Sequence, residues 1–183
     1  MSAGILLCGG ASTRFNAGGP KLLALFRGRP LVAWALEHIG AAGFDEVIVV
    51  VGAIDLAKVL TDQTVVDNRD WQSGLSSSLR AGVNEAQRRG YDSVVVGLGD
   101  QPLVPSSAWS AVQATQSPIA VANFGGRRTP PVRLTREVWP LLPTVGDIGA
   151  RELMRARPDL VRDVTCDGDC LDIDTVEDMA PRT

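Results

Sequence analysis

The chain has 183 residues, of which 45% are hydrophobic and 21% charged, and its formal net charge is −3. We expect residues 1–183 to form a single domain, because this length allows one sizeable core. The basic excess of a general nucleic-acid binder is missing. No apolar run approaches the roughly 20 residues of a membrane helix, and the first residues do not resemble a signal peptide. We therefore expect a cytoplasmic protein that binds neither nucleic acid nor membranes.

Strand-like and helix-like segments alternate along the chain. Apolar, β-branched runs predict buried strands, whereas amphipathic runs that begin near Pro30 or end at Gly43 and Gly90 predict helices. In chain order we predict strand 5–7, helix 30–42, strand 47–51, helix 53–60, strand 64–66, helix 76–89, strand 93–98, helix 106–115, strand 119–122, and helices 136–141 and 150–155. This order predicts an α/β fold, a three-layer α/β/α sandwich around a mostly parallel sheet. Ligands of such sheets bind at the carboxyl ends of the strands.

A loop of small residues follows the first predicted strand. Residues 8–13 read Cys-Gly-Gly-Ala-Ser-Thr, and two cations follow, Arg14 and Lys21. Small residues let backbone N–H groups approach an anion, and the cations neutralise it, which predicts a polyphosphate site. The loop is neither a Walker loop nor a dinucleotide fingerprint, since Lys21 lies between Pro and Leu and the glycines are adjacent. The alternative is a glycine-rich turn with two solvated cations.

Carboxylates occur at two further places. Asp100 directly follows strand 93–98 and Gly99, and residues 172–178 read Asp-Ile-Asp-Thr-Val-Glu-Asp. In an extended segment Asp172 and Asp174 lie on the same side. Two carboxylates with phosphate oxygens and water make a Mg²⁺ site, and Asp100 and Asp174 are the predicted ligands. A second interpretation of Asp174 stays open: it caps a terminal helix over residues 175–179, with Glu177 completing a capping box.

The remaining metal-binding residue types do not form a recognisable site. Cys166 and Cys170 are separated by three residues, but a zinc site needs two more soft ligands, and the single histidine is His38. Because His38 lies in the predicted helix 30–42, we expect it on a helix surface. The cysteines are interpreted as loop thiols beside a turn.

Taken together, the motifs resemble the MobA-like NTP transferases. Residues 7–14 and 20–23 are similar to the nucleotide-binding signature of that family. Its MocA branch, the molybdenum cofactor cytidylyltransferases, is similar at residues 74–82, 98–103, 146–151 and 172–178, in the same order. The resemblance implies the nucleotide-diphospho-sugar transferase type of α/β sandwich. It implies Mg²⁺-dependent transfer of a nucleoside monophosphate from an NTP to the phosphate of a molybdopterin-type acceptor, with release of pyrophosphate. An apo-molybdoenzyme is a further partner.

The resemblance also implies roles for individual residues. Arg14, Lys21 and Asp100 would be catalytic, Asp100 and Asp174 would hold the metal, and Arg151 would lie toward the acceptor. The implied nucleotide-binding residues are Leu7, Cys8, Gly9, Gly10, Arg14, Lys21, Ser76 and Ser77.

Two departures from the cytidylyl pattern bear on the substrates. Residues 8–10 read Cys-Gly-Gly where that branch usually has Ala-Ala-Gly, and this form resembles the guanylyl branch. Gly9 thus leaves space near the base for a larger purine, which favours GTP. Residues 76–78 and 172–178 follow the cytidylyl pattern, so we expect CTP, with GTP as the alternative. Residues 129–132 read Thr-Pro-Pro-Val in place of Gly-His-Pro-Val, which keeps another phosphorylated acceptor as an alternative. A non-catalytic molybdoenzyme maturation module is a third interpretation, and the retained Arg14, Lys21, Asp100 and Asp174 argue against it.

Overall fold

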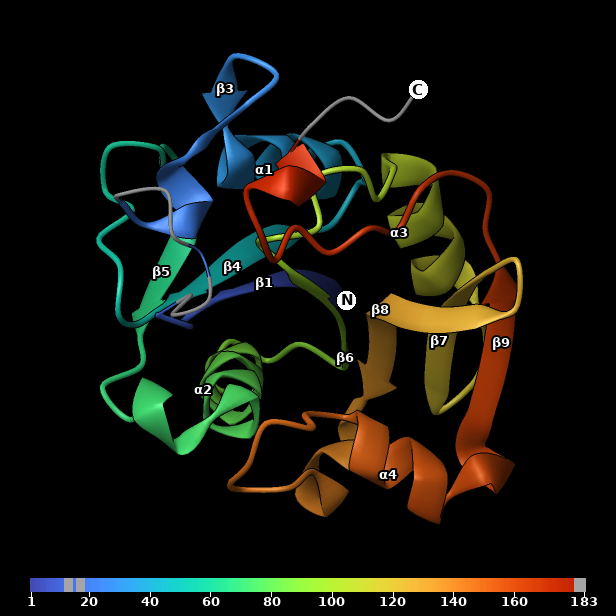
Figure 1. Ribbon diagram of the computed structural model, residues 1–183. Coiled ribbons are helices and arrows are strands. Elements are labelled where there is room, and N and C mark those ends of the chain that lie inside the picture. Colours follow the sequence, from blue (N-terminus) through green and yellow to red (C-terminus); the bar gives the residue numbers. More distant parts are fainter. Residues whose placement is uncertain (12–14, 16–18, 180–183) are drawn as a thin grey trace.

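The central feature is a seven-stranded sheet with helices on both faces (Figure 1). The computed structural model describes residues 1–11, 15 and 19–179. The strands lie in the order β5-β4-β1-β6-β8-β7-β9. Their bounds are β1 Ser2–Cys8, β4 Glu46–Val51, β5 Thr64–Asp67, β6 Ser93–Leu98, β7 Ile119–Phe124, β8 Arg127–Thr135 and β9 Val161–Thr165. A small hairpin, β2 Leu25–Phe26 with β3 Arg29–Pro30, stands apart from this sheet.

The sheet is mostly parallel, as predicted. Strand β8 pairs antiparallel with both β6 and β7, and the other pairings within the sheet are parallel. Residues 125–131 form the turn and first half of the β7–β8 hairpin. The carboxyl ends of β1 and β6 meet at one edge, because residues 7 and 98 are paired there.

Two hydrophobic cores lie on opposite faces of the sheet. Alternation along β1 sends Leu6 and Cys8 to one core and Ile5 and Leu7 to the other. Helices α1 (Leu31–Gly40) and α3 (Ser106–Ala114) cover the first face. Helices α2 (Leu75–Arg88) and α4 (Arg151–Ala156) lie on the second, below the sheet in Figure 1. The predicted three-layer sandwich is therefore confirmed. No helix in the described part of the chain is long and apolar enough to cross a membrane.

The predicted helix at residues 53–60 is wrong, because this segment is a series of turns. The Asp55 carboxylate accepts a hydrogen bond from the Ala57 backbone N–H at 2.9 Å, which closes a local turn that competes with a helix. Only one turn of helical bonding follows, where Val59 N and Leu60 N both donate to the Leu56 carbonyl. The apolar residues of the segment, Ile54 and Leu56, still reach the core.

Five short 3₁₀ helices complete the described structure. They are η1 Lys21–Leu23, η2 Trp71–Ser73, η3 Arg136–Leu141, η4 Pro158–Leu160 and η5 Glu177–Met179. Element η3 replaces the helix predicted over the same residues, and it contains Pro140, which has no N–H to donate in a helix interior.

Close packing of β6 against α3 requires a glycine at position 97. A Cβ atom built there would lie 2.3 Å from Cη2 of the buried Trp109 ring. We expect Gly97→Ala to lower the free energy of unfolding by about 1–3 kcal/mol, as overpacking of a core does. Thermal or denaturant unfolding measures this. The matched control is Gly40→Ala at the end of α1, where an added Cβ meets nothing within 4 Å. Equal stability of the two variants would contradict this account of the packing.

Candidate active site

A lysine ammonium lies between two carboxylates at the carboxyl edge of the sheet. Lys21 Nζ is 2.7 Å from Asp100 Oδ2 and 3.3 Å from Asp174 Oδ1. The Lys21 side chain is only 7% exposed, whereas those of Asp100 and Asp174 are 25% and 46% exposed. The structure thus brings together three of the residues predicted for catalysis and metal binding. Arg14, the other predicted cation, lies outside the described residues.

Backbone contacts hold the two carboxylates in place. Gly99 N donates to the Leu7 carbonyl at 3.0 Å, so the chain turns tightly over the end of β1 just before Asp100. A Cβ at Gly99 would lie 2.6 Å from Cys8 Sγ, which explains the small residue. Ile173 N donates to the Asp100 carbonyl at 3.0 Å, and the Ile173 side chain is buried in the core. This anchor sets Asp174 beside Asp100.

The open interpretation of Asp174 is resolved by its neighbours. Asp178 Oδ2 accepts hydrogen bonds from the backbone N–H groups of Asp174 and Thr175 at 3.1 and 2.9 Å. Thr175 Oγ1 accepts in turn from Asp178 N at 3.4 Å. The reciprocal capping therefore joins Thr175 and Asp178, and the pairing predicted between Asp174 and Glu177 is wrong. The Asp174 carboxylate faces Lys21 instead.

The predicted phosphate loop lines a cavity of about 420 Å³. Its walls come from the end of β1, η1, the η2–α2 junction and the end of β6. The lining residues are Leu7, Cys8, Gly9, Gly10, Ala11, Lys21, Leu22, Trp71, Gln72, Gly74, Leu75, Ser78, Leu98, Asp100 and Asp147. We call it the nucleotide cavity. Its polar floor, with a buried cation and a carboxylate, fits a polyphosphate.

The serines of α2 are placed by the phase of the helix. Ser78 lines the nucleotide cavity, and neither Ser76 nor Ser77 is among its lining residues. Ser76 is buried and its hydroxyl has no hydrogen-bond partner among the described residues. Ser77 Oγ donates to the Asp70 and Gly74 carbonyls. Ser76 and Ser77, which were predicted to contact the nucleotide, therefore do not line this cavity, whereas Ser78 does.

Gly9 was expected to leave open space near the base, but the structure shows none beside it. A Cβ at Gly9 would lie 2.6 Å from Ser78 Oγ, so the Ser78 hydroxyl already fills that position. Asn68 Nδ2 donates to Ser78 Oγ at 3.0 Å and holds the hydroxyl there. The argument that a missing methyl group makes room for a purine is therefore corrected.

The first amides of α2 are already bonded. Leu75 N donates to Asp147 Oδ1 at 3.3 Å and Ser76 N to the Gly146 carbonyl at 2.9 Å. The cap residue, Gly74, has φ +97° and no side chain, so Asp147 supplies the missing capping oxygen from a distant segment. The loop at residues 146–147 is thereby fixed against the nucleotide cavity. Sequence reasoning placed these residues in a family motif without assigning Asp147 a role.

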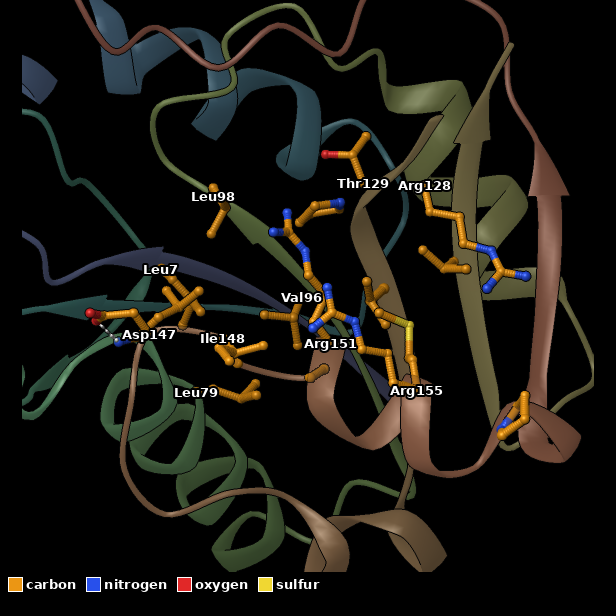
Figure 2. A pocket seen from close by; sticks show the side chains of 18 residues that line it. Leu7, Leu79, Val96, Leu98, Arg128, Thr129, Asp147, Ile148, Arg151 and Arg155 are labelled. Carbon is orange, nitrogen blue, oxygen red and sulfur yellow. Dashed lines mark hydrogen bonds between the residues drawn. The ribbon is translucent and has the colours of Figure 1, made fainter. Parts of the chain in front are cut away.

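A second cavity of about 460 Å³ adjoins the first (Figure 2). Leu7, Leu75, Leu98 and Asp147 line both. The other lining residues are Leu79, Val96, Val121, Arg128, Thr129, Pro130, Val132, Ile148, Gly149, Ala150, Arg151, Met154, Arg155 and Pro158. We call it the acceptor cavity. It is mainly apolar and includes Arg151, the residue predicted to lie toward the acceptor.

The arginines of the acceptor cavity differ in their partners. Arg128 Nε, on β8, pairs at 2.6 Å with Asp163 Oδ1 on β9, which lies beyond β7 in the sheet. Arg151 and Arg155 lie one helical turn apart on α4, and their side chains extend toward the sheet (Figure 2). Within the described ranges neither forms an ion pair. These two guanidinium groups are available to an anionic ligand, and the sequence pattern singled out only Arg151.

The Cys8 thiol is not set up as a nucleophile. Burial raises the pKa of Cys8 above its usual range, and the nearby Asp100 carboxylate raises it further. The thiolate, which is the reactive form, is therefore disfavoured. All three cysteines are free, in agreement with the absence of a disulfide framework.

The carboxylate pair fits a divalent cation. The Lys21 ammonium already acts as a stand-in cation within hydrogen-bonding distance of both Asp100 and Asp174. Among residues 1–11, 15 and 19–179, no group of three or more His, Cys, Asp or Glu side chains could hold a metal alone. Phosphate oxygens and water would have to complete the coordination, as is usual for Mg²⁺.

Comparison with known proteins assigns the family. Residues 4–161 match the MobA-like NTP transferase domain. This chain belongs to that family. The chain is 33% identical to nicotine blue oxidoreductase of Paenarthrobacter nicotinovorans, over 96% of this chain and 93% of the relative.

Solved structures agree with this assignment. The Rv0371c homologue from Mycobacterium sp. strain JC1 has a TM-score of 0.82 and is 31% identical, over 97% of this chain and 92% of that one. Rv0371c of Mycobacterium tuberculosis H37Rv in complex with manganese has a TM-score of 0.76 and is 28% identical, over 97% and 95% of the two chains. The resemblance inferred from the motifs is confirmed, as is the fold class.

Lys21 is expected to act through its charge. Lys21→Met keeps most of the side-chain volume and removes the ammonium, so kcat/KM for nucleotidyl transfer should fall by about 10²-fold or more, as when one preorganised charge donor is lost. Pyrophosphate release measures this. The control is Lys58→Met, which changes the other lysine of the chain, an exposed one. Unchanged kinetics with a lowered melting temperature would assign Lys21 a structural role.

Proposed function

We propose that this protein transfers a nucleoside monophosphate from CTP to the phosphate of a molybdopterin-type acceptor and releases pyrophosphate. The observation that carries the proposal is the buried Lys21 ammonium between Asp100 and Asp174, in a cavity that opens onto a second, arginine-bearing one. Family membership supports the reaction class. An apo-molybdoenzyme would receive the product, and the cytoplasm is the proposed location.

The reaction needs positioning and charge neutralisation more than covalent catalysis. An oxygen of the acceptor phosphate attacks the α-phosphorus of the NTP and forms the new phosphorus–oxygen bond. The bond from the α-phosphorus to the bridging oxygen breaks, and pyrophosphate leaves with those electrons. Because the acceptor oxygen is already anionic, no general base has to remove a proton. The repulsion between the two anions must be offset, and the proposal assigns this to Lys21 and Arg151, which line the two cavities.

Asp100 and Asp174 would hold a Mg²⁺ ion together with the triphosphate. When bound, the ion would supply positive charge to the phosphate oxygens and help to orient them. The manganese complex of Rv0371c supports a divalent metal in a related protein. Lys21 would direct its ammonium toward the phosphate oxygens of the bound nucleotide.

The acceptor cavity suits a ligand with a flat apolar body and an anionic group. Most of its lining is aliphatic, and Arg151 and Arg155 add positive charge on one wall. A phosphorylated pterin would offer a flat ring system to the aliphatic walls and an anionic group to the two arginines. Another phosphorylated acceptor remains the alternative. One relative is named an oxidoreductase, but the chain carries no G-x-G-x-x-G fingerprint, which favours nucleotidyl transfer.

We expect Asp100→Asn to abolish turnover and to weaken Mg²⁺-dependent nucleotide binding. The amide is neutral and cannot balance the charge of the metal or of Lys21. Pyrophosphate release from CTP with molybdopterin measures turnover, and calorimetry with CTP, with and without Mg²⁺, measures binding. Asp62→Asn, in an exposed loop, is the control. Normal pyrophosphate release by Asp100→Asn would refute the metal role.

Gly9→Ala tests how the first loop affects the base. The added methyl group would meet Ser78 Oγ at 2.6 Å, so we expect kcat/KM to fall for CTP and GTP alike. The double variant Gly9→Ala/Ser78→Ala removes the clashing hydroxyl and should recover most of the loss. A shift of the CTP/GTP ratio of kcat/KM by about tenfold in the single variant would show that Gly9 reads the base after all.

A further inference from the structure

We propose that Gln101 is a positioning residue that links the carboxylates of the nucleotide cavity to the β7–β8 hairpin beside the acceptor cavity. Its side chain is buried, with 3% of the residue exposed. The Nε2 group donates to Thr129 Oγ1 at 2.9 Å and to Asp172 Oδ1 at 2.8 Å. One amide thus joins the end of β6, strand β8 and the C-terminal segment.

On the nucleotide side, Gln101 follows Asp100 directly in the chain. Asp172 lies two residues before Asp174, and Ile173 between them is fixed to the Asp100 carbonyl. The Gln101–Asp172 hydrogen bond therefore closes a small frame around the two carboxylates that contact Lys21. A buried frame of this kind sets the separation of the carboxylates more rigidly than an exposed loop would.

On the acceptor side, Thr129 is also 3% exposed and lines the acceptor cavity between Arg128 and Pro130. Its hydroxyl accepts the hydrogen bond from Gln101. A second, exposed contact joins the hairpin to Asp172, because Arg127 Nη2 donates to Asp172 Oδ2 at 3.0 Å. The hairpin is held against the carboxylate frame at two neighbouring residues.

Two contacts balance the charge at Asp172. Its Oδ1 accepts a hydrogen bond from Gln101 Nε2 at 2.8 Å, and its Oδ2 accepts one from Arg127 Nη2 at 3.0 Å. Gln101 and Arg127 therefore reduce the cost of placing a third carboxylate beside the pair. Both contacts therefore favour the arrangement in which Asp172 lies beside Asp100 and Asp174.

The proposal rests on the proposed function for its kinetic consequence, but the link itself can be measured without ligand. Hydrogen–deuterium exchange of the full chain follows the hairpin and residues 171–174 separately. We expect Gln101→Ala to speed exchange in both segments by about fivefold, the loss of one buried hydrogen bond at each. Thr129→Val should affect the hairpin alone. The control, Gln87→Ala on the exposed face of α2, should change neither.

Steady-state kinetics with molybdopterin and CTP test the functional side. Gln101→Ala should raise the KM for molybdopterin and the Mg²⁺ concentration for half-maximal rate, each by about fivefold. Thr129→Val should raise only the KM for molybdopterin. Asp172→Asn keeps an oxygen that accepts from Gln101, so it should retain the wild-type Mg²⁺ requirement. If Gln101 had a purely structural role, Gln101→Ala would lower the melting temperature, and the variants would not differ in this way in KM and Mg²⁺ requirement.

If Gln101→Ala does not fold, Arg127→Ala is tested in its place, because it breaks only the exposed ion pair between Arg127 and Asp172. It should raise the KM for molybdopterin about two- to fivefold, within the range of a surface ion pair. Wild-type exchange in both segments of Gln101→Ala, or an unchanged KM in Arg127→Ala, overturns the proposal. A wild-type protein that transfers neither CMP nor GMP to molybdopterin overturns the proposed function instead, and the exchange data still decide the link.

Discussion

The rest of the site depends on the ion pairs that the buried Lys21 ammonium forms with Asp100 and Asp174. A desolvated cation is stable only with anionic partners, and the loss of either one leaves an uncompensated charge. Asp100 and Asp174 supply that charge from chain positions 79 and 153 residues away. Three segments that are distant in the sequence must therefore meet at one point. The tight turn at Gly99 and the buried anchor at Ile173 are the backbone features that let them do so.

The sheet places this cluster beside an apolar cavity. Parallel strands β1 and β6 deliver Leu7 and Leu98 to the same edge, where both side chains line the two cavities. Strand β8 then returns antiparallel along β6 and brings the hairpin to the far wall. Two reactants with like charges can thus lie next to each other, each against its own cations. The cation of the first cavity is buried, and two arginines of the second, Arg151 and Arg155, come from a short helix, α4.

Hydrophobic periodicity predicted the layers well because the central strands are apolar on both faces and the helices are amphipathic. It failed at residues 53–60, where the Asp55 side chain forms a local turn that periodicity does not register. The motif that contains Ser76 to Ser78 was located, but which serine faces the cavity depends on the phase of α2, and that phase is set by distant contacts such as Leu75 with Asp147. Gln101, Thr129 and Asp172 are likewise joined only in three dimensions.

The two cavities separate the proposed transfer chemistry from the proposed recognition of the acceptor. The charges that we propose for the transfer, Lys21, Asp100 and Asp174, lie on η1, after β6 and in the C-terminal segment. None of the three lines the acceptor cavity. Substitutions on α4 or at the hairpin can change the fit of an acceptor without exposing or unpairing the buried ammonium. Gln101 is the exception, because its buried side-chain amide bonds both to Thr129 in the wall of the acceptor cavity and to Asp172 beside the carboxylates. Because Thr129 lines the acceptor cavity and Asp172 lies two residues before Asp174, a change at Gln101 cannot alter the acceptor wall alone.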